Sequence, residues 1–202
     1  MHISEGVLSA PVLAAGWTLA AGGVALGLRR LDYERIMTVS IISAAFFVAS
    51  LIHVPVGPAS VHLILNGLLG AILGLAAFPA ILIALLLQAV LFQYGGFAIL
   101  GVNTFDMAFP AVLCYLMFRP WLRRGGRWRG VGAFLCGFLA VLLSGCLTAG
   151  ALALSGEAFL VTAQAILLAH IPVMFIEGIL TSIAVGFLIK VRPEMLSLSL
   201  SE

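Results

Sequence analysis

Long apolar runs, separated by short polar or charged segments, fill this chain almost from end to end. Most are close to the roughly 20 residues that a helix needs to cross a bilayer. Runs such as Ala80–Leu87 do not alternate apolar and polar residues, as a membrane β-barrel strand would. The pattern predicts an all-α membrane protein with seven transmembrane helices, the last long enough to break at Pro172. The predicted spans are Leu8–Leu28, Ile36–Ile52, Val61–Gly74, Pro79–Tyr94, Thr104–Phe118, Val131–Leu154 and Phe159–Ile189.

Composition supports this interpretation. The 202 residues are 63% hydrophobic and 9% charged, with a mean hydropathy of +1.22. A soluble domain carries about 25% charged residues, so this chain lacks the charge to cover a surface that faces water. The spans use nearly the whole length, so we expect a single polytopic membrane domain, residues 1–202. No length remains for an ATPase or a nucleic-acid-binding module.

The basic residues predict the orientation. All ten Lys and Arg fall within residues 29–35, 119–129 and 190–192. With seven spans, these three segments lie on one side, which the positive-inside rule makes cytoplasmic. The N-terminus is then outside and the C-terminus cytoplasmic. The outer side has no Lys or Arg, so its field attracts cations. Trp121 and Trp128 beside the central basic segment indicate anchoring at the membrane interface, and no nucleic-acid partner is expected.

The first two residues form a candidate metal chelate. The N-terminus lacks the basic segment of a cleaved signal peptide, so we expect Met1 to be retained as the mature terminus. The Met1 amine, the His2 amide nitrogen and the near ring nitrogen of His2 can bind one ion through a five-membered and a six-membered ring. The three donors lie nearly in one plane, and a second imidazole would complete a square. That geometry suits Ni(II) or Cu(II) better than Zn(II).

Two histidines compete to be the fourth ligand. His62 begins the third predicted span on the outer side, and the predicted loop His53–Pro58 lets the chain fold inward before it. His53 lies where the second span emerges, which favours a solvated side chain. We therefore favour His62 over His53.

Other polar residues in apolar surroundings are candidates for supporting roles. The uncharged loop Gly95–Asn103 is either a lid, in which Asn103 orients a ligating imidazole, or a plain connector. His170 and Glu177 are seven residues apart, hence on one helical face, and form either a structural pair or a proton or cation relay. Asn66 is expected to serve interhelical hydrogen bonds, as are Gln88 and Gln164.

Several segments resemble one transporter family. They are Met1–Gly6, Ser60–Gly67, Gly95–Asn103, and His170–Pro172 with Glu177–Gly178. Together they look like the CbiM/NikM-type substrate-binding (S) subunit of energy-coupling-factor nickel and cobalt transporters, over essentially the whole chain. The resemblance implies a seven-helix subunit whose outer N-terminus inserts into the bundle. It implies metal held by Met1, His2 and His62. We place Ser60, Asn66 and Asn103 beside these ligands or in the lid.

The function predicted is import of Ni²⁺ or Co²⁺, with nickel slightly favoured because d8 ions prefer a planar donor set. The metal is the transported substrate, and no organic cofactor is expected. The resemblance implies a transmembrane coupling (T) subunit, two cytoplasmic ATPase subunits and, in many systems, a small accessory membrane protein. The chain itself is then no enzyme. Its expected location is the cytoplasmic (inner) membrane of a prokaryote, with the lipid bilayer as surroundings. Its Ala/Gly-rich first span is a candidate surface for sliding on the coupling protein.

Three alternatives stay open. A stand-alone proton-coupled metal permease would use His170 and Glu177. A vitamin-binding subunit of the same transporter class would retain an organic molecule. A structural bundle would bind no metal. Zinc metalloprotease chemistry is not expected, because the sequence has no HExxH motif.

Overall fold

The computed structural model describes residues 3–51, 53–56, 59–193 and 195–196. Seven α-helices and one short β-hairpin make up this part of the chain, with single 3₁₀ turns between some of them. The helices are α1 (Ala10–Arg29), α2 (Ile36–Ala49), α3 (Asn66–Leu73), α4 (Ala77–Phe92), α5 (Leu100–Arg123), α6 (Arg127–Ser155) and α7 (Leu160–Val191). The hairpin strands are β1 (His53–Val56) and β2 (Ala59–His62).

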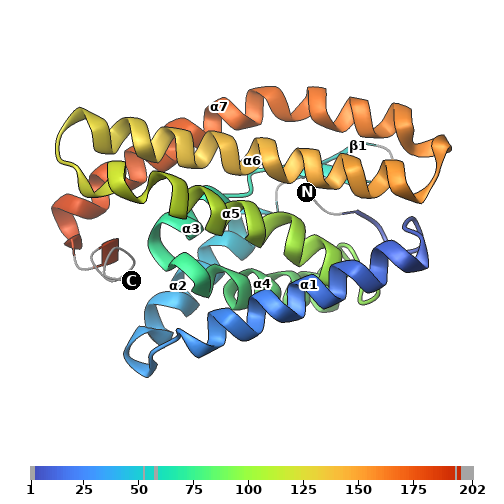
Figure 1. Ribbon diagram of the computed structural model, residues 1–202, viewed down its shortest axis with the longest axis horizontal. Helices are drawn as coiled ribbons and strands as arrows, with labels where there is room; N and C mark the ends of the chain where they lie inside the picture. Colours follow the sequence, from blue (N-terminus) through green and yellow to red (C-terminus); the bar gives the residue numbers. More distant parts are fainter. Residues whose placement is uncertain (1–2, 52, 57–58, 194, 197–202) are drawn as a thin grey trace.

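The helices form a bundle in which α6 and α7 lie side by side (Figure 1). The opposite face of α6 packs against α5, and α5 also contacts α1, α3 and α4. Among the described residues, five helical segments are long and apolar enough to cross a membrane, by length and composition: Ala10–Arg29, Asn66–Phe92, Leu100–Arg123, Arg127–Ser155 and Glu157–Val191. Helix α2 is apolar but has 14 residues. The fold is therefore that of a multi-pass helical membrane protein.

Glycines bring the central helices into close contact. A Cβ on Gly67 of α3 would lie 2.5 Å from the Cα of Gly137 of α6. A Cβ on Gly137 would lie 2.6 Å from the carbonyl oxygen of Glu177 of α7. No larger residue fits at these points, because real Cβ atoms keep a greater distance from backbone atoms. The short helix α3 is thereby held directly against α6 and α7.

The small-residue stripe of α1 faces the bundle. A Cβ on Gly16 would lie 2.3 Å from Val102 of α5, and one on Gly27 would lie 2.6 Å from Pro79 of α4. Ala20, between them, is 1% exposed. This face of α1 is used inside the chain, so only the other face of α1 can serve as the predicted sliding surface for a partner. Residues on the other face, such as Ala21, remain exposed.

The basic residues gather at one end of the bundle. Helices α1, α5 and α7 finish there, and α6 starts there (Figure 1). Arg29 closes α1, Arg123 closes α5, Arg127 opens α6, and Lys190 lies in the last turn of α7. The three-dimensional arrangement thus agrees with the one-sided charge distribution in the sequence.

The predicted third span, Val61–Gly74, is wrong as a single helix. The chain there forms strand β2, then a turn, then the eight-residue helix α3. The predicted loop His53–Pro58 is also wrong over its first four residues, because His53–Val56 pairs with β2 in antiparallel register. Gly57 and Pro58 lie outside the described residues. Proline and glycine indicated a loop, but both are tolerated at the ends of short, isolated strands.

Two further expectations are wrong for related reasons. The predicted loop Gly95–Asn103 ends early, because α5 already begins at Leu100. Gly101, which read as a loop residue, lies against Trp17 of α1, so it is a point of helix contact. Helix α7 continues through Pro172 without a break. Membrane helices tolerate proline because neighbouring groups satisfy the freed carbonyl.

Candidate metal site

The N-terminal segment enters the helix bundle at Ile3. The Ile3 side chain is fully buried. Its backbone N–H donates to the Asn103 side-chain oxygen at 3.1 Å, and its carbonyl accepts from the Asn103 amide nitrogen at 3.3 Å. One side chain of α5 thus satisfies both backbone groups of Ile3, as a neighbouring strand would. Asn103 therefore fixes the path of the N-terminal segment.

Glu5 makes a second attachment two residues later. Its carboxylate accepts a hydrogen bond from the Ala98 backbone at 3.2 Å. Gly96 lies against the same carboxylate, and a Cβ there would come within 1.9 Å of the Glu5 oxygen. The φ angle of Gly96 is +149°, which also favours glycine. The segment before α5 and the N-terminal segment therefore hold each other in place.

His62 ends strand β2, where the hairpin turns into the bundle. Its side chain is 4% exposed. The ring nitrogen Nδ1 lies 2.8 Å from the carbonyl oxygen of Leu63. A carbonyl oxygen accepts, so this contact is a hydrogen bond in the tautomer that carries its proton on Nδ1, and in that neutral tautomer the ring lone pair is on Nε2. Histidines that bind a metal commonly donate the N–H of the other ring nitrogen to a backbone carbonyl in this way.

The two competing histidines are neighbours. The hairpin register pairs His53 with His62 directly across the ladder. Directly opposed residues in an antiparallel pair have their Cα atoms about 4.5–5.5 Å apart. The sequence did not predict this proximity, because the intervening residues read as an irregular loop.

Glu177 holds the turn that follows His62. Its carboxyl group is fully buried in α7, and its Oε1 accepts hydrogen bonds from the backbone amides of Ile64 and Leu65. Leu65 has a φ of +52°, an uncommon conformation for a branched residue that needs support from its surroundings. The carboxylate also lies at the N-terminus of α3, where negative charge is favoured by the helix dipole.

His170 and Glu177 do not hydrogen-bond to each other. His170 places Nδ1 2.7 Å from the carbonyl of Ile166, within its own helix. In the part of the chain that the structure describes, Nε2 of His170 and Oε2 of Glu177 are buried and have no hydrogen-bond partner. His170 and Glu177 thus hydrogen-bond to different backbone groups. Within the described residues, each also has one buried polar atom without a hydrogen-bond partner.

Asn66 and Gln88 form the expected interhelical hydrogen bonds. The Asn66 amide donates to the carbonyl of Met107 at 3.1 Å and to Ser144 Oγ at 2.9 Å, which joins α3 to α5 and α6. The Gln88 amide donates to the carbonyl of Phe47 at 3.1 Å, which joins α4 to α2. These two predictions are confirmed, whereas Gln164 is exposed on α7. Asn66 is the first residue of α3, so these bonds fix the start of the helix that follows the turn.

Sequence reasoning missed one buried polar pair near this site. Asp106, 4% exposed in α5, accepts a hydrogen bond from Thr148 of α6 at 3.2 Å. The signal was a lone carboxylate within an apolar run, which is costly in a membrane unless paired. The roles of Ile3 and Glu5 as anchors were also missed.

The remaining predicted site residues are only partly described. Met1 and His2 lie outside the described residues, and Ser60 is described only by its backbone in β2. Within residues 3–51, 53–56, 59–193 and 195–196, no group of three or more His, Cys, Asp and Glu side chains is arranged to hold a metal.

The bundle, its apolar surface and the inserted N-terminal segment define an integral membrane protein of the multi-pass class. Comparison with known proteins is more specific. Residues 2–195 match the family model of CbiM, the cobalt uptake substrate-specific transmembrane region. The chain therefore belongs to the CbiM family, and it is a membrane component of a metal transport system.

Individual relatives agree with this assignment. A protein of Haemophilus influenzae described as a metal transport protein is 46% identical over 98% of this chain and 97% of its own length. The cobalt transport protein CbiM of Kyrpidia tusciae is 34% identical over 98% of this chain and 86% of its own. The crystal structure of a transition metal transporter superposes with a TM-score of 0.84, covering 95% of this chain and 93% of that one at 26% identity.

Proposed function

We propose that this chain is the substrate-binding membrane subunit of an energy-coupling-factor transporter that imports Ni²⁺ or Co²⁺, with nickel slightly favoured. The observation that carries the proposal is the pair of hydrogen bonds between Asn103 and the backbone of Ile3, with Ile3 fully buried. They anchor Ile3, the residue that follows Met1 and His2 in the chain, inside the bundle. An N-terminus held in this way can present its amine as a ligand.

The donor set we propose is the Met1 amine, the His2 amide and imidazole, and Nε2 of His62. The hydrogen bond from Nδ1 of His62 to Leu63 supports the last of these. Asn103 and Glu177 act through the backbone: one anchors the N-terminal segment, and the other anchors the turn after His62. Four nitrogen donors near one plane favour Ni²⁺ over Co²⁺.

We further propose that all seven helices lie in the membrane, with the basic end of the bundle facing the cytoplasm. The positive φ of Gly74 (+55°) separates α3 from α4, and Gly27 at the end of α1 touches Pro79 at the start of α4. These features support a chain reversal at the basic end, so that α3 enters and α4 returns. The N-terminus is then outside, and the membrane is the cytoplasmic membrane of a prokaryote.

Partner subunits supply the energy in this proposal. A transmembrane coupling subunit and two cytoplasmic ATPase subunits drive reorientation of the chain, with a small accessory membrane protein in some systems. The described residues form a helical membrane bundle, and ATP hydrolysis is assigned to the partners. The exposed face of α1 around Ala21 is the remaining small-residue surface on that helix for contact with the coupling subunit.

The decisive experiment blocks the terminal amine. Adding one glycine before Met1 displaces the amine from the chelate. The affinity for Ni²⁺ is expected to fall by at least about a hundredfold, because even outer partners of a metal ligand are worth about 10–100-fold. One glycine added after Glu202 is the control. Unchanged affinity in the N-terminal variant would refute the chelate.

The fourth ligand is tested by the paired histidines. His62→Ala is expected to weaken Ni²⁺ binding as much as the N-terminal glycine does, and His53→Ala is expected to change it little. Because the two Cα atoms are direct partners in the hairpin, the variants perturb the same backbone region. The reverse result would transfer the ligand role to His53.

One observation favours a second candidate function, a proton-coupled metal permease that acts alone. His170 Nε2 and Glu177 Oε2 are buried without a hydrogen-bond partner in the described part of the chain, as expected of groups that exchange protons. Vesicles that contain only this chain distinguish the two functions. Sustained Ni²⁺ uptake driven by a proton gradient, without ATPase subunits, would support the permease and contradict the energy-coupling-factor assignment.

A further inference from the structure

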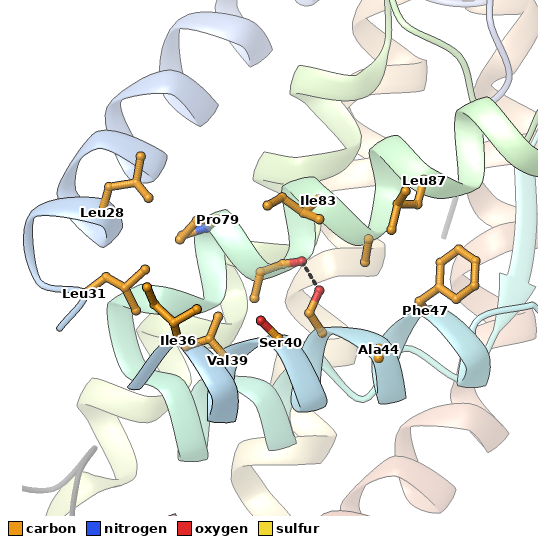
Figure 2. A pocket seen from close by; sticks show the side chains of 13 residues that line it. Leu28, Leu31, Ile36, Val39, Ser40, Ala44, Phe47, Pro79, Ile83 and Leu87 are labelled. Carbon is orange, nitrogen blue, oxygen red and sulfur yellow. Dashed lines mark hydrogen bonds between the residues drawn. The ribbon is translucent and has the colours of Figure 1, made fainter. Parts of the chain in front are cut away.

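An apolar groove opens between α2 and α4, with the end of α1 as its third wall (Figure 2). Its volume is about 410 Å³. Its walls are aliphatic and aromatic side chains, including Leu28, Ile36, Phe47, Ile83 and Leu87. That volume is within the range of about 300–1,000 Å³ for pockets that enclose organic ligands.

Two contacts keep the groove open. Gly27 lets the end of α1 press against Pro79 at the start of α4. Farther along, the Ser43 hydroxyl of α2 donates to the carbonyl of Ala80 at 2.7 Å (Figure 2). The first contact holds α1 against α4, and the second holds α2 against α4, so the groove lies between these three helices. The Ser43 hydroxyl is thereby satisfied, and Ser40 contributes the other hydroxyl in the lining.

The length of the groove matches one leaflet of a bilayer. Its lining on α2 runs from Ile36 to Phe47. Eleven residues of helix rise roughly 16 Å. Half of a typical hydrocarbon core is about 15 Å. The groove therefore extends from the basic end of the bundle to about the middle of the membrane.

A smaller basic pocket adjoins the mouth of the groove. It is lined by Arg30 and Arg35, and it shares Leu31 and Val39 with the groove. The acidic residues of the same connector, Asp32 and Glu34, are exposed and line neither cavity. The apolar groove of leaflet depth thus adjoins a pocket that two arginines line.

We infer that this composite site binds an anionic phospholipid of the inner leaflet. One acyl chain lies in the groove between α2 and α4, and the phosphate lies at Arg30 and Arg35. Guanidinium groups bind phosphate oxygens with paired, charge-assisted hydrogen bonds. Basic pockets between membrane helices on the cytoplasmic side suit anionic headgroups. The leaflet depth and the adjacent positive charge favour a lipid over a helix of another protein.

The experiment uses the full-length chain in nanodiscs of phosphatidylglycerol and phosphatidylcholine with matched acyl chains. Native mass spectrometry after release counts the lipids of each type that stay bound. We expect one retained phosphatidylglycerol, preferred over phosphatidylcholine. Each arginine near an anionic surface is worth a factor of roughly five in affinity. The variants Arg30→Gln and Arg35→Gln should each reduce the preference by about that factor.

Matched controls separate the headgroup from the acyl chain. Arg124→Gln removes an exposed arginine at the same end of the bundle that lines neither cavity, and it should leave the preference unchanged. Ala44→Phe fills the groove from α2 and should reduce retention of both lipids. Ala45→Phe, at the next exposed position and outside the lining, should not.

Two outcomes would overturn the inference. Equal retention of the two lipids by the unaltered protein would show that the arginines do not select an anionic headgroup. Crosslinking from position 44 to a protein subunit of the assembled transporter, with no lipid retained, would assign the groove to a protein partner. Neither result depends on metal binding, so the lipid site and the proposed transport function are tested separately.

Discussion

The carboxylate of Glu177 accepts a hydrogen bond from the backbone amide of Leu65 at 2.8 Å, across 112 residues of sequence. The same oxygen accepts from Ile64. A single side chain of α7 thus supports the turn that links His62 to α3. Because Leu65 adopts a positive φ there, the turn depends on this support more than an ordinary turn would.

Glu177→Ala should destabilise the protein and weaken metal binding together. The change leaves two buried amides without an acceptor, which costs about 2–4 kcal/mol of unfolding free energy. Thermal unfolding of the solubilised protein measures this loss, and a Ni²⁺ titration measures the affinity. Glu177→Gln keeps an oxygen in place and should show the smaller loss. Equal effects of Ala and Gln would mean that the charge, and not the acceptor, is what matters.

Asn103→Ala should weaken Ni²⁺ binding with less effect on stability. It removes both hydrogen bonds to Ile3, so the N-terminal segment is no longer anchored. We expect about a tenfold loss of affinity, in the range seen when a partner of a metal ligand is removed. Thr104→Val is the matched control, because the Thr104 hydroxyl is buried and makes no hydrogen bond within the described residues. If both variants bind metal normally, Asn103 does not position the terminus.

The sequence predicted the helices well where apolar runs were long and uninterrupted. The predicted first span, Leu8–Leu28, corresponds to α1 at Ala10–Arg29. The prediction from sequence failed where a glycine lies at a contact between helices or a proline lies in a paired strand. Gly101 read as a loop residue, yet it marks close contact between α5 and α1. Pro55 read as a loop residue, yet it pairs with Ser60 in the hairpin register. Local propensity cannot distinguish a turn from a point of close approach.

The site was predictable only in part. His62 followed from its polarity and its position at the outer start of an apolar run, and the structure shows it buried. The hydrogen-bond partners of Glu177 could not be predicted from the sequence, because they are backbone amides, which every residue except proline has. The pairing of Ile3 with Asn103 joins residues 100 positions apart, which a single sequence does not reveal. Met1 and His2 stay a prediction.

The affinity for Ni²⁺ should fall as the pH falls, because protons compete for the same nitrogens. An ordinary α-amine titrates near pH 8 and an ordinary imidazole near pH 6.5. Around pH 7 the chelate displaces one amine proton and one amide proton, which gives about a hundredfold change per pH unit. Below about pH 6.5 the two imidazoles steepen the dependence. A competition titration with a coloured chelator measures the slope. His62→Ala should lower the slope of the affinity against pH below pH 6.5 by one proton. An affinity that does not change with pH would contradict the proposed donor set.

The contact of α6 with α3 and α7 should tolerate no side chain at Gly137. A Cβ there would lie 2.5 Å from Thr181 Oγ1 and 2.6 Å from the Glu177 carbonyl. Gly137→Ala must push α6 away from α7. Overpacking of this kind typically lowers the free energy of unfolding by about 1–3 kcal/mol. Gly150→Ala, in the same helix, meets nothing within 4 Å. It should be neutral or stabilising by up to about 1 kcal/mol, because alanine favours the helix. Thermal unfolding of both variants measures the two stability changes.

Because Gly137 touches the residue that holds the turn after His62, Gly137→Ala should also weaken Ni²⁺ binding, and Gly150→Ala should not. Equal stability and affinity in the two variants would show that the helices can separate without moving the site.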